Sequence, residues 1–163
     1  MHPTCPKENI RIIILVFIVL VAVGVVLYLP LQPMGYPLYH WDMTYHAKTE
    51  AVTLPVSKAI QPGISVMTLT TTFPAIPGDT LVLPRISGNA VEVILNGEPI
   101  YKLGDFYAPT SNLWNSQLIV MLPASVRAEN HLELRIASSV IGVGMSSVPY
   151  LAPFSEVSQR LVW

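Results

Sequence analysis

The residues best suited to ligand chemistry lie in one turn-rich stretch, residues 103–115, which combines aromatic side chains with hydrogen-bonding ones. Aromatic rings can stack on the apolar face of a sugar, while amide and carboxylate groups can hydrogen-bond its hydroxyls. The candidate contacts in this stretch are Asp105, Phe106, Tyr107, Asn112, Trp114 and Asn115. The same composition fits two other interpretations: a loop whose aromatic residues close one end of a fold while its asparagines cap turns, and a contact with another protein.

The acidic and nucleophilic residues form no recognisable catalytic pattern. A retaining glycosidase needs two carboxylates about 5–5.5 Å apart, and nothing in the spacing of the acids brings two of them together. The acids considered are Glu92, Glu98, Asp105 and Glu133. No serine stands in a G-x-S-x-G context, and His131 has no evident partner. His40 and His46 lack a third ligand in a plausible metal-binding pattern. We therefore predict no catalytic residue, no metal site and no cofactor.

A run of eighteen residues, Ile12 to Leu29, contains no charged or strongly polar side chain. As a helix it would be about 27 Å long, close to the ~30 Å hydrocarbon thickness of a bilayer. The run predicts a transmembrane helix over residues 12–29, preceded by a tail of residues 1–11. Ala22 and Gly24 mark a small-residue face of this helix, on which another membrane helix could pack.

The charges around the apolar run predict its orientation. Lys7 and Arg11 precede the run, and the next Lys or Arg after it is Lys48. The positive-inside rule therefore places the N-terminus in the cytoplasm and the remaining body in the periplasm of a bacterial inner membrane. A cleaved signal peptide is the alternative, but the run exceeds the usual 7–15 residues and no A-x-A-like site follows it.

Prolines and aromatic residues dominate residues 30–47, which follow the predicted span. Prolines prevent the helix from continuing, and aromatic side chains of this kind settle at the depth of lipid headgroups. The sequence predicts an extended strap along the membrane or a neighbouring protein, with a simple linker as the alternative. The candidate contacts here are Tyr36, Tyr39, Trp41 and Tyr45.

Residues 48–163 predict a single domain made of strands. Short runs rich in Val, Ile, Leu and Thr alternate with turn signals, and no window shows a convincing helical pattern. The runs are 51–56, 64–73, 79–83, 90–95, 117–122, 131–137 and 147–151. Asn96-Gly97 between two of them is a strong hairpin signal, because a type I′ turn needs positive φ at both positions. The expected fold is an antiparallel, jelly-roll-like all-β sandwich.

Several segments of this body occur in an order that is typical of a known type of domain. They are Val91–Ile100 with its Asn-Gly turn, Gly104–Pro109, Leu113–Asn115, Leu122–Pro123 and Glu129–Arg135. Together they resemble the extracytoplasmic β-sandwich, similar to galactose-binding jelly rolls, of bacterial sensor kinases and diguanylate cyclases. The resemblance covers residues 64–153. It predicts the fold and does not predict a particular activity. In that family membrane helices and an output module follow, whereas this sequence ends at Trp163.

The charge and the mean hydropathy of the chain indicate which kinds of molecule it can bind. From Lys48 onward seven Lys and Arg stand against eight Asp and Glu, so a nucleic-acid partner has no electrostatic support. The mean hydropathy of +0.51 suggests that part of the surface is covered by a partner. We expect a non-enzymatic accessory subunit of a bacterial membrane complex, such as a photosynthetic or respiratory one, in contact with lipid and other membrane subunits. The alternative is a membrane-tethered module that binds a carbohydrate and signals through a separate sensor chain.

Overall fold

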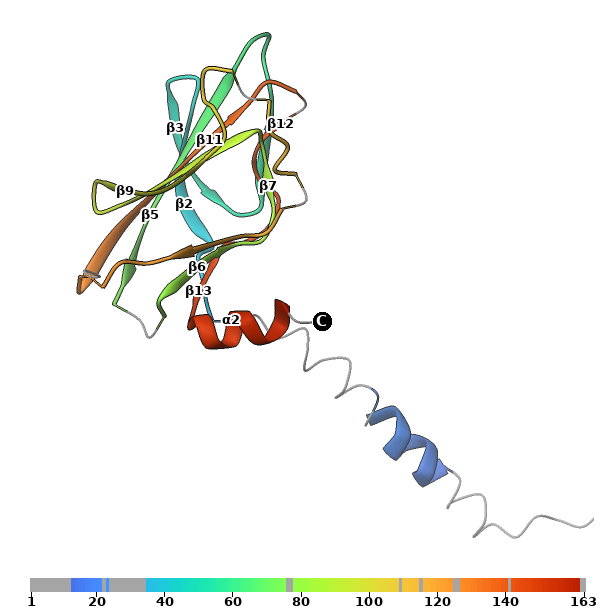
Figure 1. Cartoon of the computed structure of the whole chain (residues 1–163). Coiled ribbons are helices and arrows are strands. Elements are labelled where there is room, and N and C mark those ends of the chain that lie inside the picture. Colours follow the sequence, from blue (N-terminus) through green and yellow to red (C-terminus); the bar gives the residue numbers. More distant parts are fainter. Residues whose placement is uncertain are drawn as a thin grey trace, which may run out of the picture. The chain divides into compact units, whose positions relative to one another are not determined.

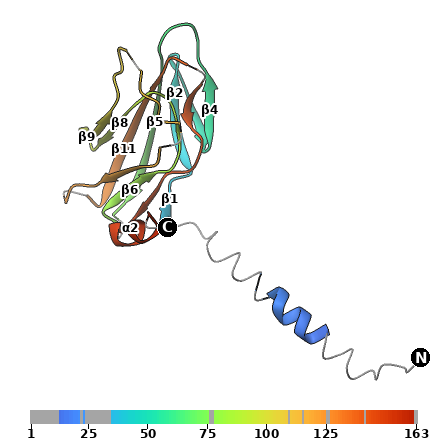
Figure 2. The same ribbon diagram turned by 45° about the vertical axis from the view of Figure 1, so that its right-hand side comes forward.

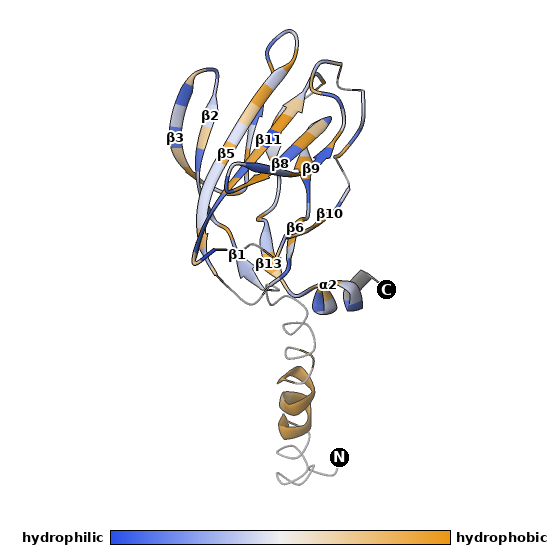
Figure 3. Ribbon diagram, turned by 60° about the vertical axis from the view of Figure 1, so that its left-hand side comes forward, coloured by the Kyte–Doolittle hydropathy of each residue, from blue (hydrophilic) through white to orange (hydrophobic). Residues whose placement is uncertain are grey.

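The computed structural model describes residues 13–21, 23, 35–75, 78–108, 110–114, 116–124, 127–140 and 142–161. The chain divides into two compact units, Met1–Pro33 and Met34–Trp163. In the first unit, residues 13–21 are helical and uniformly hydrophobic (Figure 3). No helix within the described residues is long and apolar enough to cross a membrane. Ala22, Gly24, the tail of residues 1–11 and most of the remaining predicted span lie outside the described residues.

The second unit is an all-β antiparallel sandwich, consistent with a jelly-roll type of domain (Figure 1). Its largest sheet has the strand order β3-β2-β5-β11-β8-β9. In that order the strands are Lys48–Thr53, His40–Tyr45, Ser65–Pro74, Glu129–Ser138, Ala90–Leu95 and Glu98–Leu103. The predicted sandwich is therefore confirmed, and the Asn96-Gly97 hairpin joins β8 to β9 with positive φ at both turn residues.

Two smaller antiparallel sheets form the rest of the sandwich. One has the order β1-β13-β6-β10 and the other β4-β12-β7. The strands of the first are Tyr36–Pro37, Tyr150–Ala152, Thr80–Leu83 and Leu118–Met121. The strands of the second are Val56–Ala59, Gly142–Met145 and Ile86–Ser87. One hydrophobic core includes residues from all three sheets, so the six-stranded sheet has one buried face and one outer face.

Strand β11 shows why the six-stranded sheet has two different faces. Leu132, Leu134 and Ile136 are fully buried, whereas the alternating residues His131 and Arg135 are exposed. Side chains of a strand point alternately to opposite faces, so this sequence buries one face and leaves the other polar. The apolar and polar residues of 131–136 alternate strictly in the sequence, which predicts a half-buried strand, and the structure confirms it.

The predicted strap of residues 30–47 needs correction, because the sandwich begins before residue 48. Residues 36–37 form β1, and residues 40–45 form β2, which pairs with both β3 and β5 inside the largest sheet. Trp41 and Met43 are buried while Asp42 and Thr44 are exposed. This alternation is the pattern of a half-buried strand, and the prolines and aromatic residues concealed it.

A short helix near the C-terminus, α2 (Phe154–Leu161), also differs from the sequence prediction. Its Val157 is buried against Val82 and Ala152, so α2 covers the outer side of β6 (Figure 2). Leu81 and Leu83 of the same strand face the main core, which explains why all four residues of β6 are buried. With eight residues, and with Val157 as the buried apolar side chain among the described positions 154–159, α2 is too short to give a helical periodicity in the sequence.

Candidate functional site

The outer face of the six-stranded sheet is the part of the sandwich best suited to bind a ligand. The pairing register sets His131 of β11 opposite Thr72 of β5. It also sets Asp42 of β2 opposite Thr70 on one side and opposite Ala51 of β3 on the other. Hydroxyl, carboxylate and imidazole groups from strands far apart in the sequence therefore meet on one surface.

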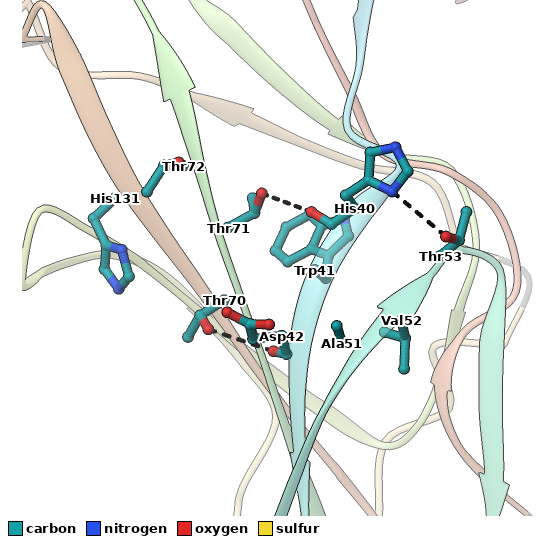
Figure 4. A pocket seen from close by; sticks show the side chains of 10 residues that line it. All are labelled: His40, Trp41, Asp42, Ala51, Val52, Thr53, Thr70, Thr71, Thr72 and His131. Carbon is teal, nitrogen blue, oxygen red and sulfur yellow. Dashed lines mark hydrogen bonds between the residues drawn. The ribbon is translucent and has the colours of Figure 1, made fainter.

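A pocket of about 460 Å³ lies on this face. Its volume falls within the ~300–1,000 Å³ typical of small-molecule sites. Figure 4 shows His40 and His131 on opposite sides of the pocket, with consecutive threonines of β5 between them. The lining residues are His40, Trp41, Asp42, Ala51, Val52, Thr53, Thr70, Thr71, Thr72 and His131.

Hydrogen bonds between neighbouring strands hold part of this lining in place. The Thr71 hydroxyl donates to the backbone oxygen of His40 at 2.8 Å. The Thr70 hydroxyl makes a longer bond of 3.4 Å to the backbone oxygen of Asp42. Because these bonds join β5 to β2, the floor of the pocket is a rigid surface of paired strands rather than a loop.

Other polar groups of the pocket remain available for a ligand. Within the described part of the chain, the Asp42 carboxylate, the Thr72 hydroxyl and the His131 imidazole have no hydrogen-bond partner. A carboxylate accepts hydrogen bonds, whereas a hydroxyl and a neutral imidazole can each both donate and accept. The pocket can therefore satisfy a ligand that carries several hydroxyl groups.

The nearest cationic side chain on this face, Arg135, is already paired with two acidic side chains. Arg135 Nε lies 2.6 Å from Glu133 Oε1, and its Nη1 lies 3.4 Å from Glu92 Oε2. No Lys or Arg is among the described residues that line the pocket, whereas Asp42 adds a negative charge. This charge distribution favours a neutral ligand over a phosphate or a carboxylate. The described residues also contain no group of three or more His, Cys, Asp or Glu placed to hold a metal ion.

The loop predicted to bind a ligand lies outside this pocket, and its described polar residues cap turns. Asp105 Oδ1 accepts a hydrogen bond from the backbone N–H of Tyr107 at 2.8 Å. Asn112 Oδ1 accepts one from the backbone N–H of Trp114 at 3.1 Å. These bonds match the turn-capping interpretation, which the sequence had left open. Asn115 lies outside the described residues.

The aromatic residues of the loop do not form one stacking surface. Phe106 is half-buried, with Lys102 Nζ 5.6 Å from its ring centroid. Trp114 is half-buried, and Tyr107 is 90% exposed. None of these three residues lines the pocket on the sheet.

The aromatic residues of the predicted strap have separate positions. Tyr36 and Tyr39 are exposed, as expected of contact residues. Trp41 is only 3% exposed, and its indole N–H donates to the backbone oxygen of Leu38 at 2.7 Å, so it packs mainly in the core, and it also lines the pocket on the sheet. Tyr45 is half-buried, and its hydroxyl donates to the backbone oxygen of Ala59 at 2.7 Å.

Sequence reasoning missed the pocket, although a signal for it was present. Thr68, Thr70 and Thr72 alternate along β5 on the side away from the core, while Leu69 and Phe73 are buried. A period-two pattern of threonines predicts a polar sheet face. It does not predict which strands lie beside β5, because β2 and β11 are brought there by pairings between distant residues. Asp42 pairs with Thr70, 28 positions away, and His131 pairs with Thr72, 59 positions away.

No protein-family model matches this chain. No curated protein matches its sequence either. The functional argument therefore rests on the geometry of the pocket and on the pattern of the sequence.

Proposed function

We propose that the chain is a non-enzymatic binding protein whose β-sandwich takes up a neutral, polyhydroxylated ligand, a carbohydrate, on the outer face of its six-stranded sheet. The observation that carries this proposal is the pocket lined by four threonines, two histidines and one aspartate, with no cationic side chain among its described residues. Sugar hydroxyls both donate and accept hydrogen bonds, as the threonine and imidazole groups do.

The placement of the acidic residues supports the absence of a catalytic role in this proposal. Glu92 and Glu133 on this sheet are both paired with Arg135. Asp42 is the one carboxylate among the described lining residues. Glycoside hydrolysis by the usual route needs two.

We further propose that the apolar segment of residues 12–29 anchors the protein in a bacterial inner membrane, with the sandwich on the periplasmic side. The support is in the sequence: eighteen residues without a charge, with Lys7 and Arg11 before them. Anchoring would keep the binding domain at the membrane surface, where a separate sensor chain can respond to the bound ligand.

The test compares two threonines on the same strand and the same face. Thr70 lines the pocket and Thr68, two residues away, does not. For the full chain in nanodiscs, Thr70→Val should weaken sugar binding about 5-fold, because the Thr70 hydroxyl, which donates its proton to the backbone oxygen of Asp42, can still accept one ligand hydrogen bond of about 1 kcal/mol, and valine removes that acceptor without changing shape. Thr68→Val should leave binding unchanged, and His131→Ala should weaken it at least as much as Thr70→Val.

The measurement is isothermal titration calorimetry with neutral sugars. The probes are glucose, galactose, mannose and N-acetylglucosamine, each as the free monosaccharide and as a linear tetramer. Binding that is reduced by Thr70→Val and not by Thr68→Val supports the proposal. Absence of binding by every probe at millimolar concentration, or equal effects of the two substitutions, contradicts it.

A second candidate function is the accessory subunit of a larger membrane complex. The observation that favours it is the 90% exposure of Tyr107, together with exposed Met121 and Val140, because large hydrophobic side chains at a surface are common in protein contacts. Solubilisation of native membranes in mild detergent distinguishes the candidates. An accessory subunit migrates with a large complex, whereas a free binding module migrates as a 17.9 kDa chain in its micelle.

A further inference from the structure

A second hollow adjoins the pocket on the sheet. It has a volume of about 270 Å³ and is lined by Tyr36, Pro37, Leu38, Tyr39, His40, Thr71 and Thr72. Three of these residues, His40, Thr71 and Thr72, also line the first pocket. The two hollows therefore adjoin each other along shared walls.

The two hollows differ in chemistry. The first is lined mainly by hydroxyl, imidazole and carboxylate groups, whereas the second contains two tyrosines that are 44% and 43% exposed. A tyrosine ring offers an apolar surface with a polar tip. A pyranose ring has the matching surface, because its axial C–H groups form an apolar face and its hydroxyls project from the rim.

The backbone around both tyrosines is held in place. Tyr36 pairs with Leu151 in the β1–β13 ladder. The Leu38 N–H donates to the Pro149 oxygen at 2.9 Å, and the Tyr39 oxygen accepts from the Leu54 N–H at the same distance. A surface whose backbone is ordered before binding loses less conformational entropy when a ligand arrives.

The distance across the first pocket also favours a long ligand. Its lining runs from Thr53 on β3 through β2 and β5 to His131 on β11. Four adjacent strands span three strand spacings, or about 14 Å. The second hollow adjoins this path at His40, Thr71 and Thr72.

We propose that the two hollows form one continuous groove that binds a linear, neutral oligosaccharide, with one sugar unit against the threonines and the next stacked on Tyr36 or Tyr39. This inference rests on the proposed carbohydrate-binding function and adds that the ligand is a chain. The hydroxyl-lined pocket supplies hydrogen bonds to one unit, and the tyrosines supply stacking to the adjacent unit.

The experiment compares chain length with the wild-type full chain and Tyr39→Ala in nanodiscs, again by calorimetry with monosaccharides and their linear tetramers. The tetramer of the preferred sugar should bind about 10-fold or more tightly than the monosaccharide. Tyr39→Ala should reduce the affinity for the tetramer about 3- to 10-fold, because that is the change expected when one stacking contact is lost. The matched control is Tyr107→Ala, which removes an exposed tyrosine outside both hollows and should have no effect.

The outcomes separate this inference from the function on which it rests. If the tetramer and the monosaccharide bind equally, with Thr70→Val weakening both and Tyr39→Ala weakening neither, the pocket binds a single sugar and the groove is contradicted. If no probe binds, the carbohydrate function itself is overturned. Tighter binding of the tetramer that disappears in Tyr39→Ala and persists in Tyr107→Ala supports both.

Discussion

At the scale of single residues, Asn89 links parts of the fold that are far apart in the sequence. It is 4% exposed, and its side-chain N–H donates to the Ser111 backbone oxygen at 2.5 Å. Its side-chain oxygen accepts hydrogen bonds from the Ser138 hydroxyl at 3.2 Å and from the Ser139 N–H at 3.0 Å. One amide therefore joins the start of β8, the end of β11 and the loop that follows β9.

Replacing the Asn89 side chain should destabilise the fold. Its buried hydrogen-bonding partners would lose their hydrogen bonds and would not regain contact with water. We predict that Asn89→Ala lowers the free energy of unfolding by about 2 kcal/mol. The control is Asn112→Ala, an exposed residue with a single capping bond, which should change it by less than about 0.5 kcal/mol. Urea unfolding followed by circular dichroism measures both, and equal effects would show that Asn89 is not a structural link.

The residues of the candidate site could be recognised from the sequence only in part. Residues 103–115 combine types that bind sugars elsewhere, but Asp105 and Asn112 use their side chains to cap local turns. The pocket instead takes Asp42, Thr70 and His131 from three strands. Its composition depends on which strands become neighbours, and local pattern does not encode that.

At the scale of elements, Asp79 determines how α2 begins. Its Oδ1 accepts hydrogen bonds from the backbone N–H of Phe154 at 2.7 Å and from the Thr80 hydroxyl at 2.9 Å. The bond from Phe154 is the main reason, and the Thr80 hydroxyl the second, that the pKa of this carboxyl lies below its ordinary value. A carboxylate that accepts bonds at the start of a helix is stabilised in its charged form.

The depressed pKa makes the contribution of Asp79 depend on pH. Because the folded-state pKa is the lower one, the stabilisation is present above the unfolded-state pKa and is lost as pH falls through the folded-state value. We predict that Asp79→Ala has a lower melting temperature than the wild type at pH 7 and that the gap closes in strong acid. Thermal unfolding from pH 7 to pH 2 tests this, with Asp79→Asn as a control that keeps an acceptor oxygen and removes the titration. A gap that stays constant with pH would contradict it.

Elements with a strong local pattern were predictable, and elements defined by tertiary contacts were not. The β8–β9 hairpin follows from Asn96-Gly97, and β11 follows from its alternation. In contrast, β2 was hidden among prolines and aromatic residues, and α2 packs on the sandwich through Val157. Such elements are stabilised mainly by packing against the rest of the sandwich.

At the scale of the whole molecule, the account combines a membrane anchor with a binding domain. We predict that the full chain remains in the membrane pellet after alkaline carbonate extraction. Val19→Arg combined with Val21→Arg should release it, because two arginines near the centre of a span raise the insertion free energy by about 6 kcal/mol. Recovery of the wild-type chain in the supernatant, or a mature N-terminus after residue 30, would contradict the anchor.

Threonine-methyl NMR can show whether the outer face of the six-stranded sheet binds a carbohydrate. The full chain in nanodiscs, with ¹³C-labelled threonine methyl groups, would be titrated with the linear sugar tetramers. The account predicts that the signals of the pocket residues Thr53, Thr70, Thr71 and Thr72 shift, while those of Thr44 and Thr49, elsewhere on the same sheet, stay in place. Shifts confined to Thr110 in the loop after β9, or no shift at any threonine, would contradict it.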